Sequence, residues 1–223
     1  MRLFNRTSET RPGATGPERT ARAAPDVQFL LTRVGSERVR NGGGAVLAFT
    51  SANPGEGVSH VVRVLASQLA TQTGRPTMLV EAGRMAQLRA TELRNIPSAC
   101  ARTNVTNLWL LRKATSANGN GSKPTNPPEP LLPEAANRLD PVEALRATFA
   151  HTLIDCPPLS ASYEAALLAR KVDGVVLVVE ADRTKRDQIL RARHTIETAN
   201  GKLMALVLNK RRHVVPEWLY RML

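Results

Sequence analysis

The sequence predicts an α/β protein whose doubly wound, mostly parallel sheet is covered by helices on both faces. Short continuous apolar runs, such as residues 45–49 and 174–180, are typical of strands buried on both faces, and stretches with helical spacing separate them. The 223 residues are 42% hydrophobic but only 4% aromatic, which suits a core of Val, Leu and Ala. Strands that alternate with helices favour right-handed crossovers and therefore parallel pairing.

The first half of the chain is expected to hold a tail and the first three strands. Residues 1–26 are rich in Arg, Thr, Pro and Gly, which predicts a disordered basic tail, and a single domain is expected over residues 27–223. Residues 27–34 are a candidate amphipathic helix before the glycines at 42–44. The next elements expected are a strand at 45–49, a helix at 61–70, a strand at 76–82, a helix-like stretch at 85–93 and a strand at 107–111.

A long loop is expected to separate the two halves of the sheet. Residues 113–130 are so dense in Asn, Gly, Ser and Pro that we interpret them as a flexible surface loop. The elements expected after it are a helix at 141–149, a strand at 151–156, a helix at 163–171, a strand at 174–180, a helix at 185–199 and a strand at 203–209. Helices therefore alternate with strands to the end of the predicted sheet.

The turn after the first strand has the form of a phosphate-binding loop. We interpret its residues as contacts for a nucleotide, and they are Pro54, Gly55, Glu56, Gly57, Val58, Ser59 and His60. Gly55 and Gly57 supply the backbone freedom that a nest of N–H donors needs, and the next helix presents its N-terminus to an anion. Ser59 occupies the Mg²⁺-ligand position, but Val58 stands where such loops place lysine. The alternative is a strand-to-helix turn without a ligand.

The substitution of the loop lysine by Val58 affects binding less than turnover. One charge-assisted contact to phosphate contributes about 1.5–3 kcal/mol, so its loss lowers nucleotide affinity about ten- to a hundredfold. Cationic groups that stabilise a transferring phosphoryl group contribute about 10³–10⁵ in rate. We therefore expect binding to survive where turnover does not.

Two acids end neighbouring predicted strands. Asp155 follows an apolar run in the manner of a Walker B carboxylate, which would hold Mg²⁺ together with Ser59, although a strand-end acid that caps the next turn fits as well. Glu81 ends the second strand at the edge where such folds bind ligands, and it is a candidate for positioning a catalytic water or a solvated strand end. Arg84 is a candidate to bring a guanidinium to the phosphates in place of the missing lysine.

Charge and cysteine usage restrict the cellular setting. The formal net charge is +12, and residues 182–223 hold ten Lys or Arg against four acids, which favours an acidic partner or, alternatively, a solvated helix face. Cys100 and Cys156 lack metal-ligand spacing and are interpreted as free thiols in a reducing compartment. The sequence has no signal peptide and no apolar run of about 20 residues, so we expect a cytoplasmic protein.

Taken in order, these motifs resemble the cytoplasmic P-loop domain of bacterial tyrosine kinases of the capsular and exopolysaccharide family, which are relatives of the ParA and MinD ATPases. The similarity covers roughly residues 27–221. It is carried by AFTSANPGEGVSHVVRVLASQLA, PTMLVEAGR, NLWLL with NPPEPLL, FAHTLIDCPPLSASYEAALLARKVDGVVLVVEADRTKRDQ and MALVLNKRRHVVPEWLYRML. The later stretches are the more specific to this family.

The sequence departs from the family pattern at positions that carry chemistry. The family's loop lysine, its following Thr and the two Asp of its second Walker motif correspond here to Val58, His60, Glu81 and Gly83. Ser59 and Asp155 match the pattern. In place of the family's C-terminal tyrosine cluster, the chain has only Tyr163 and Tyr220, and the family's oligomerisation helix is blurred in residues 27–34.

The resemblance with these departures implies a degenerate, catalytically inactive member that regulates capsular or exopolysaccharide biosynthesis and export. One alternative is an active ATPase or protein tyrosine autokinase, and another is a ParA/MinD-like positioning protein that binds DNA or membrane. The implied cofactor is ATP or ADP with Mg²⁺. The implied partner is the cytoplasmic part of a membrane polysaccharide co-polymerase of the chain-length-determinant type, which would keep the protein at the inner face of the membrane. Self-association is compatible with the resemblance, and specific nucleic-acid binding is not expected.

Overall fold

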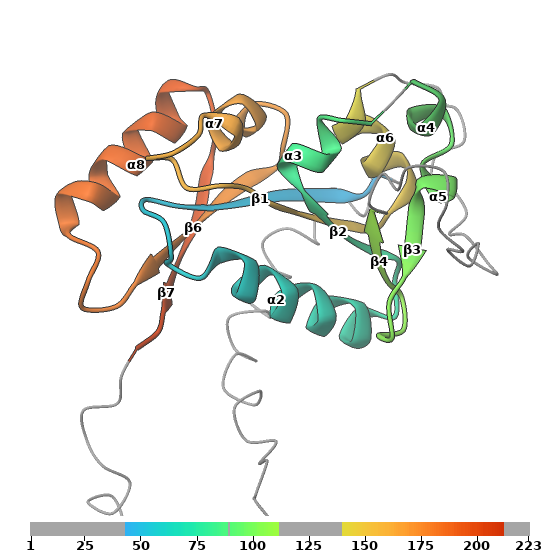
Figure 1. The fold of residues 1–223 in the computed structure, drawn as a ribbon, viewed down its shortest axis with the longest axis horizontal. Coiled ribbons are helices and arrows are strands. Elements are labelled where there is room, and N and C mark those ends of the chain that lie inside the picture. Colours follow the sequence, from blue (N-terminus) through green and yellow to red (C-terminus); the bar gives the residue numbers. More distant parts are fainter. Residues whose placement is uncertain (1–42, 89, 112–139, 212–223) are drawn as a thin grey trace, which may run out of the picture.

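The computed structural model describes residues 43–88, 90–111 and 140–211, which form a seven-stranded sheet with the strand order β3-β4-β2-β5-β1-β6-β7 (Figure 1). The strands are β1 (Ala45–Ser51), β2 (Thr77–Glu81), β3 (Cys100–Arg102), β4 (Leu108–Leu111), β5 (His151–Asp155), β6 (Gly174–Glu180) and β7 (Leu203–Asn209). Every pairing is parallel except that of β3 with β4. The predicted doubly wound, mostly parallel sheet is therefore confirmed.

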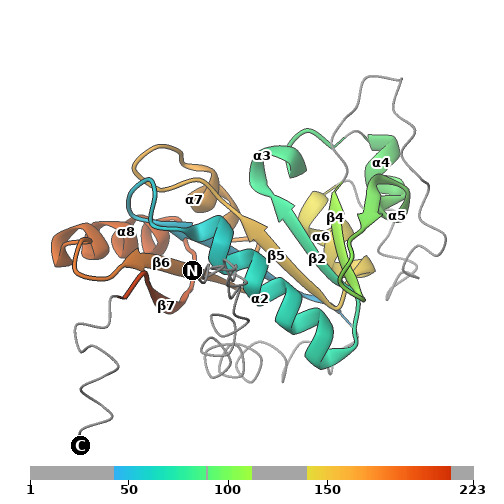
Figure 2. The same cartoon turned by 60° about the horizontal axis from the view of Figure 1, so that its bottom comes forward.

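Helices cover both faces of this sheet, as Figures 1 and 2 show. The helices are α2 (Val58–Thr73), α3 (Ala82–Met85), α4 (Ala90–Arg94), α5 (Ile96–Ala99), α6 (Pro141–Thr148), α7 (Glu164–Ala169) and α8 (Arg186–Thr198). Helix α2 lies on one face, while α3, α6, α7 and α8 lie on the other. The sheet is therefore buried on both sides over its central strands.

Alternate residues of each central strand enter two different cores. Leu47 and Phe49 of β1 pack with α2, whereas Val46 and Ala48 pack with α6 and α7. All seven residues of β1 are buried, because the strand occupies an interior position in the sheet and helices lie on both faces. This explains why its sequence is a continuous apolar run and not an alternating one.

Local signals set several helix ends. Helix α2 ends at Gly74, whose left-handed backbone (φ 63°) is the conformation that glycine adopts without strain, and the Gly74 N–H donates to Ala70 O. Helix α6 begins after Asp140, whose side chain accepts a hydrogen bond from the Val142 N–H at 2.9 Å. The sequence predicted the start of α6 at the correct residue, 141, whereas its helix at 61–70 stops three residues before the end of α2.

The structure corrects the sequence prediction around residues 82–102. The single helix-like stretch expected at 85–93 is replaced by α3 and α4 with a turn between them. Strand β3 was not predicted, since three residues with one buried side chain give no periodic signal. It pairs antiparallel with β4 and extends the sheet at that edge.

Several predictions fall outside the described residues. They are the tail at 1–26, the helix at 27–34, the loop at 113–130, and Tyr220 with the rest of the basic C-terminal stretch beyond residue 211. Within the three described ranges, no helix is both long and apolar enough to cross a membrane.

Candidate functional site

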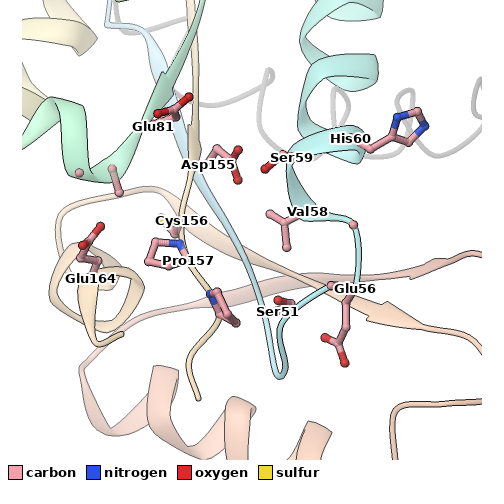
Figure 3. Close-up of a pocket in the computed structure, with 15 residues that line it drawn as sticks. Ser51, Glu56, Val58, Ser59, His60, Glu81, Asp155, Cys156, Pro157 and Glu164 are labelled. Carbon is pink, nitrogen blue, oxygen red and sulfur yellow. The ribbon is translucent and has the colours of Figure 1, made fainter. Parts of the chain in front are cut away.

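A cavity of about 550 Å³ lies where β1, β2 and β5 end (Figure 3). The register places Glu81 beside Asp155 and Phe49 beside Asp155, so three parallel strands end together at one edge of the sheet. The cavity is lined by Ser51, Gly55, Glu56, Gly57, Val58, Ser59, His60, Glu81, Ala82, Gly83, Asp155, Cys156, Pro157, Pro158 and Glu164. Every site residue that the sequence indicated is in this set except Arg84 and Pro54, of which Pro54 is exposed beside the cavity.

The loop that precedes α2 has the backbone geometry of an anion nest. Gly55 (φ 81°) and Gly57 (φ 91°) both have a left-handed backbone, and Gly57 caps the sixteen-residue helix α2. A Cβ atom at Gly57 would clash with the side-chain amide nitrogen of Asn209, whereas one at Gly55 would meet nothing within 4 Å. The first N–H groups of α2 have no intrahelical acceptor, so they are available to an anion in the cavity.

Glu56 braces the loop through its side chain. Its carboxylate accepts hydrogen bonds from Ala52 N at 3.0 Å, Asn53 Nδ2 at 2.9 Å and Thr184 Oγ1 at 2.6 Å. The residue is only 3% exposed. Figure 3 shows this carboxylate on the side of the loop away from Asp155. The sequence indicated Glu56 as a nucleotide contact. Its side chain instead stabilises the loop from the side that faces away from Asp155.

Ser59 and Asp155, the two expected Mg²⁺ ligands, face each other in the cavity. The Ser59 hydroxyl is hydrogen-bonded to the Asp155 carboxylate (Figure 3). Burial raises the pKa of the Asp155 carboxyl and the nearby Glu81 carboxylate adds to the rise, while the Ser59 hydrogen bond and the Arg63 charge oppose it. A hydroxyl and a carboxylate side by side at a helix N-terminus are a suitable pair for a Mg²⁺ ion that also binds phosphate oxygens.

At the position where such loops place lysine, Val58 makes an apolar contact with the core. Val58 is 8% exposed and packs into the core beneath α2, and His60 is exposed. Arg84 does not line the cavity, and its Nε lies 2.9 Å from Glu81 Oε2. The guanidinium that was a candidate to replace the lysine is thus paired with the strand-end acid. Among the described residues that line the cavity, none is Lys or Arg.

Two titratable residues that line the cavity were not indicated as site residues by the sequence. Glu164, in the first turn of α7, directs its side chain at the cavity, and its Oε2 is buried without a hydrogen-bond partner among the described residues. Cys156 is buried, and this burial raises the pKa of its thiol far above the usual range, with Asp155 and Glu164 adding to the effect. A reactive thiolate is therefore not favoured there.

Two further residues contact the loop from the end of β7. Asn209 and Lys210 donate hydrogen bonds to its backbone carbonyls and were also not indicated. The one signal in the sequence is their place after an apolar strand, at the edge where the other strands end. That signal predicts at which edge of the sheet Asn209 and Lys210 lie, but it does not predict their hydrogen bonds to the loop.

The donors and acceptors fit a Mg²⁺-bound phosphate chain. Backbone N–H groups of the loop would bind phosphate oxygens, while Ser59 and Asp155 would hold the ion. Within residues 43–88, 90–111 and 140–211, no group of three or more His, Cys, Asp or Glu side chains is arranged to hold a metal. Mg²⁺ commonly binds in this incomplete way, with one or two protein ligands, waters and the phosphates of its nucleotide.

Comparison with known proteins places the chain. It is 30% identical over 178 residues to the tyrosine-protein kinase CpsD of Streptococcus agalactiae, covering 74% of this chain and 75% of that protein. It is 28% identical over 177 residues to the tyrosine-protein kinase YwqD of Bacillus subtilis, covering 73% of this chain and 71% of that protein. No family model matches the chain.

Solved structures share the fold. The kinase domain of the Escherichia coli tyrosine kinase ETK has a TM-score of 0.61 at 15% identity and covers 95% of this chain and 86% of its own. The septum site-determining protein MinD of Pyrococcus horikoshii, solved with Mg-ADP, has a TM-score of 0.52 at 14% identity and covers 81% of this chain and 77% of its own. The sequence relatives and the shared fold agree, and the chain belongs to the bacterial tyrosine-protein kinase family, with the P-loop fold that this family shares with MinD.

Proposed function

We propose that this protein binds a Mg²⁺-nucleotide without turning it over and acts as a regulator of capsular or exopolysaccharide biosynthesis. One observation carries the proposal. The loop and the Ser59–Asp155 pair keep the arrangement that phosphate binding needs, while Val58 buries an apolar side chain where the catalytic cation belongs. The family membership supports the role in polysaccharide biosynthesis. The expectation that the nucleotide is bound but not hydrolysed depends on how much the missing loop lysine contributes to affinity and to rate.

Backbone donors and the lysine act at different stages of the reaction. The N–H groups of the loop and the N-terminus of α2 contact phosphate in the ground state, so they contribute to affinity. A loop cation contributes most when charge develops on the transferring phosphoryl group, where such groups supply about 10³–10⁵ in rate. Replacing that cation by Val58 therefore removes turnover to a greater extent than binding.

The charge of the cavity makes binding depend on the metal. Glu81, Asp155 and Glu164 line it, and no Lys or Arg stands among its described lining residues. A free triphosphate would meet like charges there, whereas a Mg²⁺ ion held by Ser59 and Asp155 offsets them. We expect saturable binding of Mg-ADP and Mg-ATP and little binding of either nucleotide without Mg²⁺.

The partner and the location belong to the same proposal. We propose that the protein docks on the cytoplasmic part of a membrane polysaccharide co-polymerase, and that this partner brings it to the inner face of the membrane. The support is the family membership together with the motifs that resemble the capsular and exopolysaccharide kinases. Nucleotide occupancy would then be the signal that the regulator reports to its partner.

Calorimetric titration of ADP and ATP, each with and without Mg²⁺, into the wild type and Val58→Lys tests the proposal. We expect the wild type to bind both Mg²⁺-nucleotides without hydrolysis, and V58K to bind them about ten- to a hundredfold more tightly. Val61→Lys is the matched control, because it adds the same charge on α2 at a position that does not line the cavity.

Each alternative gives a different result in that titration. Hydrolysis by the wild type that Asp155→Asn abolishes would identify an active ATPase or autokinase and overturn the proposed inactivity. An absence of binding in every titration would remove the nucleotide from the proposal and leave a scaffold protein. DNA affinity that falls steeply with salt would favour the ParA/MinD-like positioning role.

A further inference from the structure

Two consecutive carbonyl groups of the loop are held by side chains from the end of β7. Lys210 Nζ donates to Gly55 O at 2.6 Å, and Asn209 Nδ2 donates to Glu56 O at 2.9 Å. Lys210 Nζ also lies 3.1 Å from Glu180 Oε2, at the end of β6. Both carbonyl oxygens therefore point toward the end of β7, on the outer side of the loop.

The orientation of a carbonyl fixes the orientation of the next N–H. A trans peptide is planar, and its N–H points opposite to its C=O. The structure has no cis peptide among its described residues. Holding Gly55 O and Glu56 O toward β7 therefore directs the N–H groups of Glu56 and Gly57 the other way, toward the cavity that these residues line.

We propose that Lys210 and Asn209 are positioning residues, which fix the loop so that two of its N–H groups face the phosphates of a bound nucleotide. The inference rests on the proposed nucleotide binding and names the groups that prepare the loop for it. It assigns to this chain a lysine that acts on the phosphate site from outside the loop, through a backbone carbonyl and not through the phosphate itself.

Free glycine torsions make such a restraint necessary. Gly55 has a left-handed backbone (φ 81°), and because glycine has no Cβ, its own side chain does not restrict rotation of the following peptide. The rotated peptide would turn a carbonyl oxygen into the cavity and repel phosphate. In a loop with Val58 in place of lysine, correctly oriented N–H groups account for a larger share of the affinity.

The surroundings of Lys210 hold it in a conformation that lysine rarely adopts. Its backbone is left-handed (φ 57°), which is strained for a non-glycine residue and persists only where neighbouring contacts impose it. Two such contacts are present, since Ala181 N donates to Asn209 O at 2.9 Å and the ammonium group pairs with Glu180. The hydrogen bond from Lys210 also lowers the pKa of the Glu180 carboxyl.

The test removes the charge of Lys210 and keeps its stem. Lys210→Met is compared with Lys210→Arg, which restores a donor, and with Arg211→Met, which removes a charge of the same sign one residue further on. The backbone amide signals of Glu56 and Gly57 are followed by NMR in the nucleotide-free protein, and Mg-ADP affinity is measured by calorimetry. Because Lys210 is half exposed, K210M is expected to fold with a Tm close to that of the wild type.

We expect K210M to shift or broaden the Glu56 and Gly57 amide signals and to weaken Mg-ADP binding about tenfold. K210R should recover most of both effects, and R211M should match the wild type. Unchanged amide signals in K210M would overturn the inference, as would unchanged affinity in a wild type that binds Mg-ADP. If the wild type binds no Mg-ADP, the proposed function fails, while the amide signals of the free protein still decide whether Lys210 orients the loop.

Discussion

The two ends of the parallel strands use charged side chains in opposite ways. At the amino ends, Arg146 Nη1 lies 2.7 Å from Asp173 Oδ2 and 2.9 Å from Gly44 O, and the same Asp173 oxygen accepts a hydrogen bond from Val46 N at 2.8 Å. At the carboxyl ends, Asp155 and Glu164 face a cavity that no described Lys or Arg side chain lines.

The burial of charged side chains therefore does not show which end of the strands holds the functional site. The groups with which those side chains pair are a better indication. The side chains of Arg146 and Asp173 are 9% and 10% exposed, so this pair outside the site is nearly as deeply buried as Glu56 within it, which is 3% exposed. Arg146 Nη1 and Asp173 Oδ2 bind each other and the backbone of Gly44 and Val46, which joins the start of β1 to the turn before β6. The acids at the other end lack a cationic partner in the cavity, and a ligand that brings Mg²⁺ would supply one.

The largest expected effect comes from breaking the pair at the amino ends. Arg146→Met leaves Asp173 and the Gly44 carbonyl without their guanidinium donor, and removal of one partner from a buried pair costs about 3–5 kcal/mol. Urea unfolding should show this loss. Glu143→Gln is the control, because Glu143 is 3.6 Å from Arg146 Nε and partly exposed, so that contact contributes about 0–1 kcal/mol. An R146M protein as stable as E143Q would contradict the comparison.

The second effect is a loss of stability in acid, which also arises at the amino ends. Burial, with the Arg75 charge adding to it, lowers the pKa of His151 to about 4. The unfolded chain takes up this proton near pH 6.5 and the folded protein does not until about pH 4, so stability falls as the pH drops between these values. We expect a loss of about 2–3 kcal/mol over that window, measured by urea unfolding at each pH. His151→Leu should flatten this part of the profile, and an unchanged slope would rule His151 out as its source.

Two glycines of the loop at the carboxyl ends, Gly55 and Gly57, test whether the contact with β7 shapes this loop. Both have positive φ, but a Cβ at Gly57 clashes with Asn209 and one at Gly55 meets nothing. We expect Gly55→Ala to cost about 1 kcal/mol and Gly57→Ala about 2–3 kcal/mol in unfolding free energy. Mg-ADP affinity should fall further in G57A than in G55A. Equal effects of the two substitutions would show that the contact with β7 does not shape the loop.

The smallest effect has the opposite sign. An acid whose pKa is raised by folding destabilises the folded state when it ionises, so the penalty from Asp155 is present above its folded pKa and is relieved as the pH falls. Asp155→Asn should therefore raise the Tm slightly at neutral pH, by about 1–2 °C after allowance for solvent screening, and should abolish Mg²⁺-dependent nucleotide binding. A lower Tm for Asp155→Asn than for the wild type would show that Asp155 stabilises the fold, as Arg146 and Asp173 do at the amino ends of the strands.

The sequence predicted the fold better than the site. The strands and helices are set by local sequence patterns, whereas several contacts of the site join residues far apart in the sequence. Strands such as β1 and β6 are continuous apolar runs, and a neighbouring helix identifies them locally. Ser59 and Asp155 were indicated by local motifs as well, the first by the phosphate-binding loop and the second by the acid that ends an apolar run. Strand β3 was missed because three residues carry too little pattern.

Long-range contacts account for the rest of what the sequence did not reveal. Lys210 and Asn209 lie 155 and 153 residues beyond the loop carbonyls that they hold. The buried role of Glu56 depends on Thr184, which lies 128 residues away. Arg84 was indicated from charge alone, and the structure places it on Glu81, three residues earlier in the chain. No local rule assigns such partners.

The brace from β7 has a consequence for the order of events during synthesis on the ribosome. The loop is made early, and the residues that hold its carbonyls follow 153 and 155 positions later, which at about 5–20 residues per second is a delay of about 8–30 s. The nascent chain therefore contains the loop long before it can set the loop's shape. A chain stalled with residue 200 as its last should leave residues 52–60 open to protease, and a released chain should protect them.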